Sequence, residues 1–65
     1  MTPSDIVYIR GSLGMTQEQF AESVNANVGT VSRWERGASK PWRKMHLAAL
    51  AARKRQVEMK KESKK

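Results

Sequence analysis

The sequence predicts an all-α protein, folded as a compact bundle of four to five helices. Apolar residues recur at helical spacing along most of the chain, whereas no segment alternates apolar and polar residues long enough to predict a strand. Capping residues and glycines divide the chain into segments of helical length. The 65 residues include no cysteine, so a single small core must be stabilised by close helix packing or by association.

Start and end signals define the first two helices. The first is expected to begin near residues 3–4 and to end at Gly14, which tolerates a left-handed backbone. Its apolar face comprises Ile6, Ile9 and Leu13. The second is expected to begin at Thr16, which has capping-box spacing to Gln19, and to end at Asn25. Its buried residues are expected to be Phe20, Ala21 and Val24.

The third and fourth helices are defined in the same way. Asn27 is expected to cap a helix over residues 28–36, which ends at Gly37. Its inward positions are Val31 and Trp34. A fourth helix is expected to begin at Pro41, a favoured first-turn residue, and to run to about residue 60. Its packing face is expected to comprise Leu47, Leu50 and Ala51, followed by Val57 and Met59 as the last apolar anchors.

The charge of the chain is concentrated in its C-terminal part. The formal net charge is +7, which favours an anionic partner such as nucleic acid. Residues 1–40 include four basic and four acidic residues, whereas residues 41–65 include nine and two. Residues 60–65 are expected to form a frayed or disordered tail. The sequence therefore divides into a folded domain, residues 1–52, and a basic helix end with a flexible tail, residues 53–65.

Several classes of protein are excluded by what the sequence lacks. No apolar run approaches the roughly 20 residues that span a membrane, and no signal-peptide core is present, so a cytoplasmic protein is expected. There is no cysteine nucleophile, no histidine with a base partner and no phosphate-binding glycine loop, so we expect no enzyme. His46 is the single histidine and is not expected to bind a metal. No cofactor is expected.

Four segments of the sequence occur in a specific order: Ile9 and Arg10, then residues 13–21 (LGMTQEQFA), then residues 30–37 (TVSRWERG), then Pro41 and Leu47. In these segments the chain resembles the lambda repressor/Cro-type (Xre-like) helix-turn-helix family over residues 9–50. The WERG ending, placed after Thr16 and Gln17, is the specific part of the match. The resemblance implies that residues 1–52 are a helix-turn-helix domain that binds double-stranded DNA. Its third helix, residues 27–36, would lie in the major groove with the second helix crossing above it.

The resemblance also implies a DNA-binding surface around the third helix. Gln17 matches the family's glutamine at the start of the second helix, which contacts phosphate and supports the third helix. Arg33, on the exposed face, is the best candidate for a bidentate contact to guanine, and Ser32 is expected to bind phosphate or base. The predicted DNA-binding residues are Gln17, Asn27, Val28, Gly29, Thr30, Ser32, Arg33, Arg36, Lys40, Trp42, Arg43 and Lys44.

Val28 and Gly29 depart from common members of the family, many of which have glutamine, arginine or serine there. Two interpretations remain open. Either the helix backbone approaches DNA closely at Gly29 and Val28 touches a thymine methyl, or neither residue reads a base. Specificity then depends mainly on Asn27, Thr30 and Arg33.

Other residues have a structural interpretation beside the functional one. Arg10 and Glu35 match a family pair that forms a partly buried ion pair between the first and third helices, and both are expected to be structural. Trp34 is expected in the core. Trp42 is expected either to pack on the third helix or to lie along the sugar-phosphate backbone. His46 is expected to contact phosphate or to lie at a dimer surface.

The basic residues after the third helix also allow two interpretations. Lys40, Arg43 and Lys44 are either phosphate contacts or solvated side chains, and their place beside the third helix favours phosphate contact. Residues 53–55 (RKR) and the terminal lysines form either a solvated helix or a source of non-specific DNA affinity.

The function that the sequence supports is a sequence-specific transcription regulator, a repressor that binds a palindromic operator as a homodimer. One alternative is an antitoxin or small phage-type regulator whose C-terminal helix also binds a partner protein. The other is an architectural DNA-binding protein that depends on the basic tail.

Overall fold

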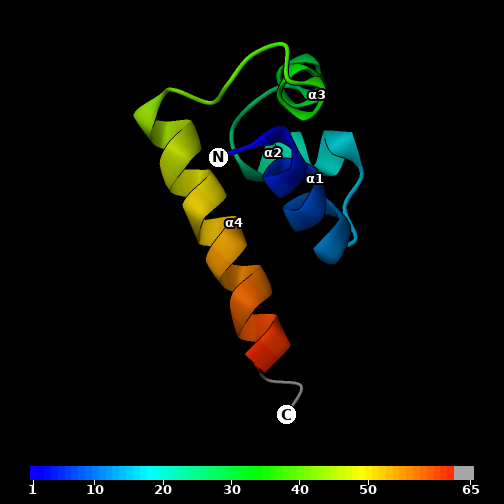
Figure 1. Ribbon diagram of the computed structural model, residues 1–65, viewed down its shortest axis with the longest axis vertical. Helices are drawn as coiled ribbons and strands as arrows, with labels where there is room; N and C mark the ends of the chain where they lie inside the picture. Colours follow the sequence, from blue (N-terminus) through cyan, green and yellow to red (C-terminus); the bar gives the residue numbers. More distant parts are fainter. Residues whose placement is uncertain (63–65) are drawn as a thin grey trace.

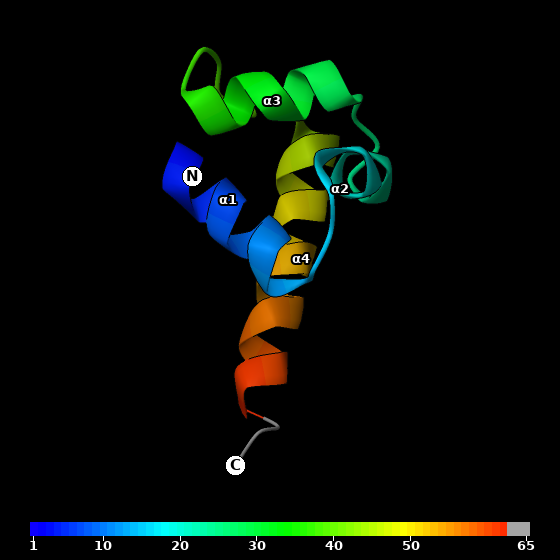
Figure 2. The same ribbon diagram turned by 90° about the vertical axis from the view of Figure 1, so that its right-hand side faces the viewer.

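The computed structural model describes residues 1–62 of the chain and the side chains of residues 1–59. Within this part the elements are α1 (Pro3–Ser12), α2 (Gln17–Ser23), α3 (Val28–Arg36) and α4 (Lys44–Glu62), and no strand is present. The short helices α1, α2 and α3 group around the N-terminal half of α4, which extends beyond them toward the C-terminus (Figures 1 and 2). The predicted all-α fold class is confirmed.

Reciprocal caps determine where α1 and α2 begin. Thr16 Oγ1 accepts a hydrogen bond from the Gln19 backbone N–H at 3.1 Å, and Gln19 Oε1 accepts one from the Thr16 N–H at 3.0 Å. This is the predicted capping box of α2. α1 has a second box that sequence reasoning missed, in which Thr2 Oγ1 accepts from the Asp5 N–H and Asp5 accepts from the Thr2 N–H.

Left-handed residues end the first three helices where the sequence predicted. The φ angle is 68° at Gly14, 59° at Asn25 and 79° at Gly37. Asn25 lies in the connection between α2 and α3, residues 24–27, where asparagine tolerates this backbone better than most residues. The sharp reversal there directs α3 across α2, as a helix-turn-helix requires.

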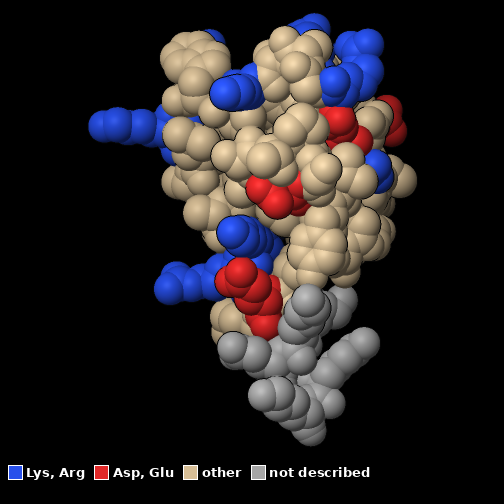
Figure 3. Space-filling model, viewed as in Figure 1, with Lys and Arg blue, Asp and Glu red and all other residues tan. Residues whose placement is uncertain are grey.

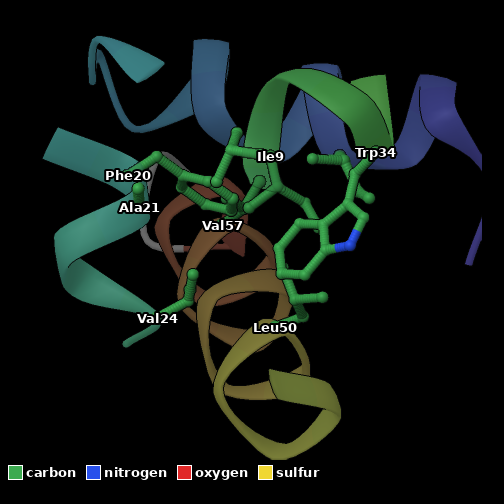
Figure 4. Packing of buried hydrophobic residues seen from close by; sticks show 9 residues of the cluster. Ile9, Phe20, Ala21, Val24, Trp34, Leu50 and Val57 are labelled. Carbon is green, nitrogen blue, oxygen red and sulfur yellow. The ribbon is translucent and has the colours of Figure 1, made fainter. Parts of the chain in front are cut away.

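All four helices contribute to one hydrophobic core (Figure 4). α3 packs against both α1 and α2, and α1 packs against α4. The apolar faces predicted for the first three helices are confirmed, with Leu13 only partly buried. The buried residues are Ile6, Ile9, Phe20, Ala21, Val24, Val31, Trp34, Leu50 and Val57.

The beginning of α4 differs from the prediction. The helix begins at Lys44 rather than at Pro41, and its first helical hydrogen bond joins the Leu47 N–H to the Arg43 carbonyl at 2.9 Å. The chain leaves α3 at Gly37 and must cross to the start of α4, as Figure 1 shows. Pro41 disfavours helical backbone in the residue before it, so the segment around it is irregular and spans this distance.

The packing face of α4 also differs from the prediction. Leu50 is fully buried as expected, but Leu47 is 42% exposed and Ala51 is exposed too. Instead the inward face follows positions 46, 49, 50, 53 and 57. Two stripes of α4 have helical spacing, and periodicity alone does not select between them because both contain apolar residues.

The C-terminal half of α4 belongs to the same fold. Val57 is 3% exposed and lies in the core cluster, so the core extends beyond residue 52, where sequence reasoning drew the domain boundary. Arg53 is half-buried rather than solvated, whereas Lys54, Arg55 and Met59 are exposed. The helix reaches Glu62, so residues 60–62 are helical rather than frayed. The rest of the predicted tail, residues 63–65, lies outside the described residues.

Candidate nucleic-acid interface

The surface of α3 that faces away from the core carries two arginines and a glycine. With 3.6 residues per turn, Gly29, Arg33 and Arg36 fall at i, i+4 and i+7, opposite the buried Val31 and Trp34. We call these three residues the outward ridge. Arg33 and Arg36 are exposed, and neither forms an ion pair with the side chains that the structure describes. The ridge therefore offers free guanidinium groups to an anionic partner.

The first turn of α3 is held by its own side chains. Asn27 Oδ1 accepts hydrogen bonds from the Thr30 backbone N–H and from the Thr30 hydroxyl, both at 2.9 Å. This confirms Asn27 as the N-cap. Val28, another of the predicted DNA-binding residues, follows this cap, and its side chain is 41% exposed. Helices leave their first N–H groups without intrahelical partners, so this turn presents partial positive charge outward.

An ion pair joins α1 to α3, as the sequence predicted. Arg10 Nε donates to Glu35 Oε2 at 2.6 Å, and Arg10 Nη2 donates to Glu35 Oε1 at 3.3 Å. Arg10 Nη1 also donates to the Met15 carbonyl at 3.1 Å. The side chains are 24% and 8% exposed, so the pair is largely removed from water. Arg10 thereby holds the α1–α2 connection and the end of α3 in one arrangement.

Gln17 joins the same network from the first turn of α2. Its Nε2 donates to Glu35 Oε1 at 2.9 Å, which accounts for the predicted support of α3. The predicted phosphate contact of Gln17 stays a prediction. Burial alone raises the pKa of Glu35, but the hydrogen bonds from Arg10 and Gln17 and the charge of Arg10 outweigh it. The pKa of this carboxyl is therefore below its ordinary value of 4.5, and Glu35 is an anion at neutral pH.

A groove of about 520 Å³ lies beside α3, between its N-terminal half, the connection to α4 and the first turn of α4. We call it the linker groove. It brings together six of the predicted DNA-binding residues, from α3 with its cap and from the connection to α4: Asn27, Thr30, Arg33, Lys40, Trp42 and Arg43. Figure 3 shows Lys and Arg side chains around the end of the molecule where α3 lies. The groove therefore combines cationic, amide and aromatic groups next to the outward ridge.

Trp42 and His46, both in the wall of this groove, have different surroundings. Trp42 is 75% exposed, so it does not pack on α3, and the Arg43 guanidinium lies over its ring at 5.2 Å from the centroid. His46 is half-buried and meets the Trp34 ring edge-on, with the centroids 5.2 Å apart. Its Nε2 lies 3.3 Å from the Asn25 carbonyl, a contact in which the ring nitrogen donates.

His46 thus braces α4 against the connection between α2 and α3, a role that sequence reasoning missed. The signal was its spacing of four residues before Leu50 on α4.

Of the other predicted residues, Ser32 is half-buried on α3 and Lys44 is exposed at the start of α4. Among the described residues no three potential ligands form a metal-binding group, and none of the helices is long and apolar enough to cross a membrane.

Comparison with known proteins identifies the arrangement of α1, α2 and α3. A helix-turn-helix family model of the lambda repressor/Xre type matches residues 6–41, more than half of the chain. No curated protein and no solved structure matches the chain significantly. The matched residues contain the Arg10–Glu35–Gln17 network, the α2–α3 connection and the outward ridge. The chain therefore belongs to the lambda repressor/Xre-type helix-turn-helix family of DNA-binding transcription regulators.

Proposed function

We propose that this protein is a repressor that binds a palindromic operator as a homodimer, with α3 in the major groove of each half-site. The outward ridge is the observation that carries the proposal, because its two arginines are exposed and form no ion pair with the side chains of residues 1–59. An α-helix fits the major groove, where guanine offers O6 and N7 to a guanidinium. In this proposal Arg33, in the second turn of α3, forms such a contact.

The linker groove and the start of α2 supply the backbone contacts in this proposal. Lys40 and Arg43 come from the segment that follows α3, and Trp42 offers an exposed ring against the sugar-phosphate chain. Lys44 and Gln17 flank this surface. Phosphate contacts fix the register of a protein on DNA but carry no sequence information, so they account for affinity rather than discrimination.

Dimerisation follows from the energetics of a small module. One helix-turn-helix unit buries roughly 600–1,000 Å² on DNA, which gives weak binding by itself. Two copies related by a two-fold axis read both halves of a palindrome about 34–36 Å apart. The nonspecific affinity of the pair is expected to fall steeply with salt, because each phosphate contact releases counterions.

Selection of bound sequences from a random DNA library, followed by titration at moderate salt, tests this function. We expect a palindromic consensus bound at least about 10³-fold more tightly than random DNA. Arg33→Ala is expected to abolish the discrimination, whereas the matched control Arg55→Ala, an exposed arginine of α4, should leave it intact. Equal binding of selected and random DNA would refute the proposal.

An antitoxin or phage-type regulator is the alternative, and the outer face of α4 is the observation that favours it. Leu47 is 42% and Met59 62% exposed on this helix, so α4 offers apolar side chains to a partner protein. Co-purification with the product of a neighbouring gene would favour this function. A stable dimer with high operator affinity and no co-purifying protein would favour the repressor.

A further inference from the structure

Neither the backbone conformation nor the packing around position 29 requires a glycine there. Gly29 lies inside the first turn of α3, and its φ is not in the left-handed region that requires glycine. A Cβ added there would meet only Asn27 Oδ1, at 3.5 Å, which is an ordinary van der Waals contact. Glycine is also a poor helix former, so alanine would suit this position better by the internal structure alone. The residue instead lies on the outward ridge, where a ligand would meet it.

Gly29 follows an exposed apolar side chain at the start of α3. Val28 precedes it and is 41% exposed, with no group that can donate or accept a hydrogen bond. Two polar groups of the same turn, Asn27 Oδ1 and the Thr30 hydroxyl, are bonded to each other. On the floor of the major groove the base-edge group that suits an apolar side chain is the 5-methyl of thymine.

Arg33 follows Gly29 by four residues on the same ridge and is exposed. Its planar guanidinium matches the O6 and N7 acceptors of guanine, the commonest specific contact in the major groove. Val28 and Arg33 are five residues apart, so they lie about 7.5 Å apart along the helix axis and on opposite flanks of Gly29, roughly 140° apart around it. The two side chains therefore reach different base pairs of the half-site.

We propose that α3 recognises a half-site that contains both a thymine, whose methyl is contacted by Val28, and a guanine at a different base pair, bound by Arg33. Gly29 permits both contacts, because the absence of its side chain lets the helix backbone reach van der Waals distance of the DNA. This inference rests on the proposed function and specifies the chemistry of its DNA site. Of the two interpretations that the sequence left open for Val28 and Gly29, this proposal adopts the one in which both residues face the bases.

Gly29→Ala separates DNA approach from internal packing, and Gly11→Ala is its matched control. Gly11 is an exposed glycine of α1, and a Cβ there would meet nothing within 4 Å. Each substitution is expected to raise the melting temperature by about 4–8 °C, since alanine favours both helices. Gly29→Ala is also expected to lower affinity for the selected operator at least about tenfold, a loss of about 1.4 kcal/mol. Gly11→Ala should leave that affinity unchanged.

Base analogues test the two base contacts in the same operator. Replacing the contacted thymine by deoxyuracil removes one methyl and is expected to weaken the wild-type protein about fourfold. Val28→Ala should be insensitive to this replacement. Likewise 7-deazaguanine, which lacks the N7 acceptor, should weaken the wild-type protein but not Arg33→Ala.

The outcomes distinguish this inference from the proposed function. If the wild-type protein shows no preference for any sequence, the proposed function fails and the inference with it. If the wild-type protein binds a selected operator but Gly29→Ala binds equally tightly, the inference alone is overturned. The same holds if no thymine of the half-site responds to deoxyuracil. A more stable Gly29→Ala protein with reduced operator affinity supports it.

Discussion

Replacing Arg10 by methionine tests how α3 is held in place. The substitution keeps an unbranched apolar stem but removes the two hydrogen bonds to Glu35 and the one to the Met15 carbonyl. Glu35 then remains as a carboxylate with a side chain only 8% exposed, bonded to Gln17 alone. Stranding a buried charge costs about 3–5 kcal/mol. Because Arg10 is itself 24% exposed, solvent screening lowers the expected loss to about 2–3 kcal/mol.

A loss of this size is a large part of the stability of a small domain. At about 0.05–0.15 kcal/mol per residue, a chain of 65 residues has a free energy of unfolding of about 3–10 kcal/mol. The melting temperature is therefore expected to fall by at least about 10 °C. Thermal and urea unfolding followed by circular dichroism measure both quantities. Arg36→Met is the matched control, since this exposed arginine of α3 forms no ion pair within the described part of the chain, and it should change stability by less than about 0.5 kcal/mol.

The double variant Arg10→Met with Glu35→Gln completes the test. Neutralising Glu35 removes the stranded charge, so the double variant should be more stable than Arg10→Met alone by about 1 kcal/mol or more. Operator affinity measured well below the melting temperature should remain within a few-fold of wild type, since Arg10 lies behind α3. A stability loss for Arg10→Met no larger than that of Arg36→Met would refute the structural role. Loss of operator binding by the folded variant would instead show that the ion pair keeps α3 in its DNA-binding arrangement, and would not by itself assign Arg10 to a DNA contact.

Three further predictions concern pH, the linker groove and the basic helix. Because the pKa of Glu35 is depressed in the folded protein, its contribution to stability is present above the unfolded pKa and is lost as pH falls through the folded one. Urea titrations from about pH 6 to about pH 3 should therefore show that the free energy of unfolding falls less with acid for Glu35→Gln than for wild type. An equal dependence of this free energy on pH in the two proteins would contradict the prediction. Trp42→Ala should change stability by less than about 0.5 kcal/mol, because the ring is 75% exposed, but lower DNA affinity several-fold in a fluorescence titration; unchanged affinity would remove it from the interface. Lys54→Gln with Arg55→Gln should weaken operator and random DNA equally and reduce the salt slope by at most about 2, whereas complete loss of binding would favour an architectural binder. Substitution suits this last test better than truncation after residue 52, which would also remove the buried Val57.

Part of the site was predictable because its signals are local. The Thr16–Gln19 box, the Asn27 cap and the end at Gly37 each depend on hydrogen bonds within a few residues, so the sequence predicted α2 and α3 well. The Arg10–Glu35 pair joins residues 25 positions apart, and only the family resemblance predicted it. The Thr2–Asp5 box was missed although its spacing is equally local, because aspartate rather than glutamate or glutamine completes it.

The amino-acid sequence by itself determined α1, α2 and α3, their ends and their core faces, because each depends on periodicity and on caps close in the chain. It also indicated that a fourth helix follows, but not where that helix begins. Only the tertiary structure decided how α4 is used. Two faces of that helix have helical spacing, and contact with α1 selects the one with Leu50 and Val57 while exposing Leu47. The same packing sets His46 against Trp34 and forms the linker groove from segments distant in the chain. These choices depend on which surfaces meet after the helices have formed, and local signals do not encode them.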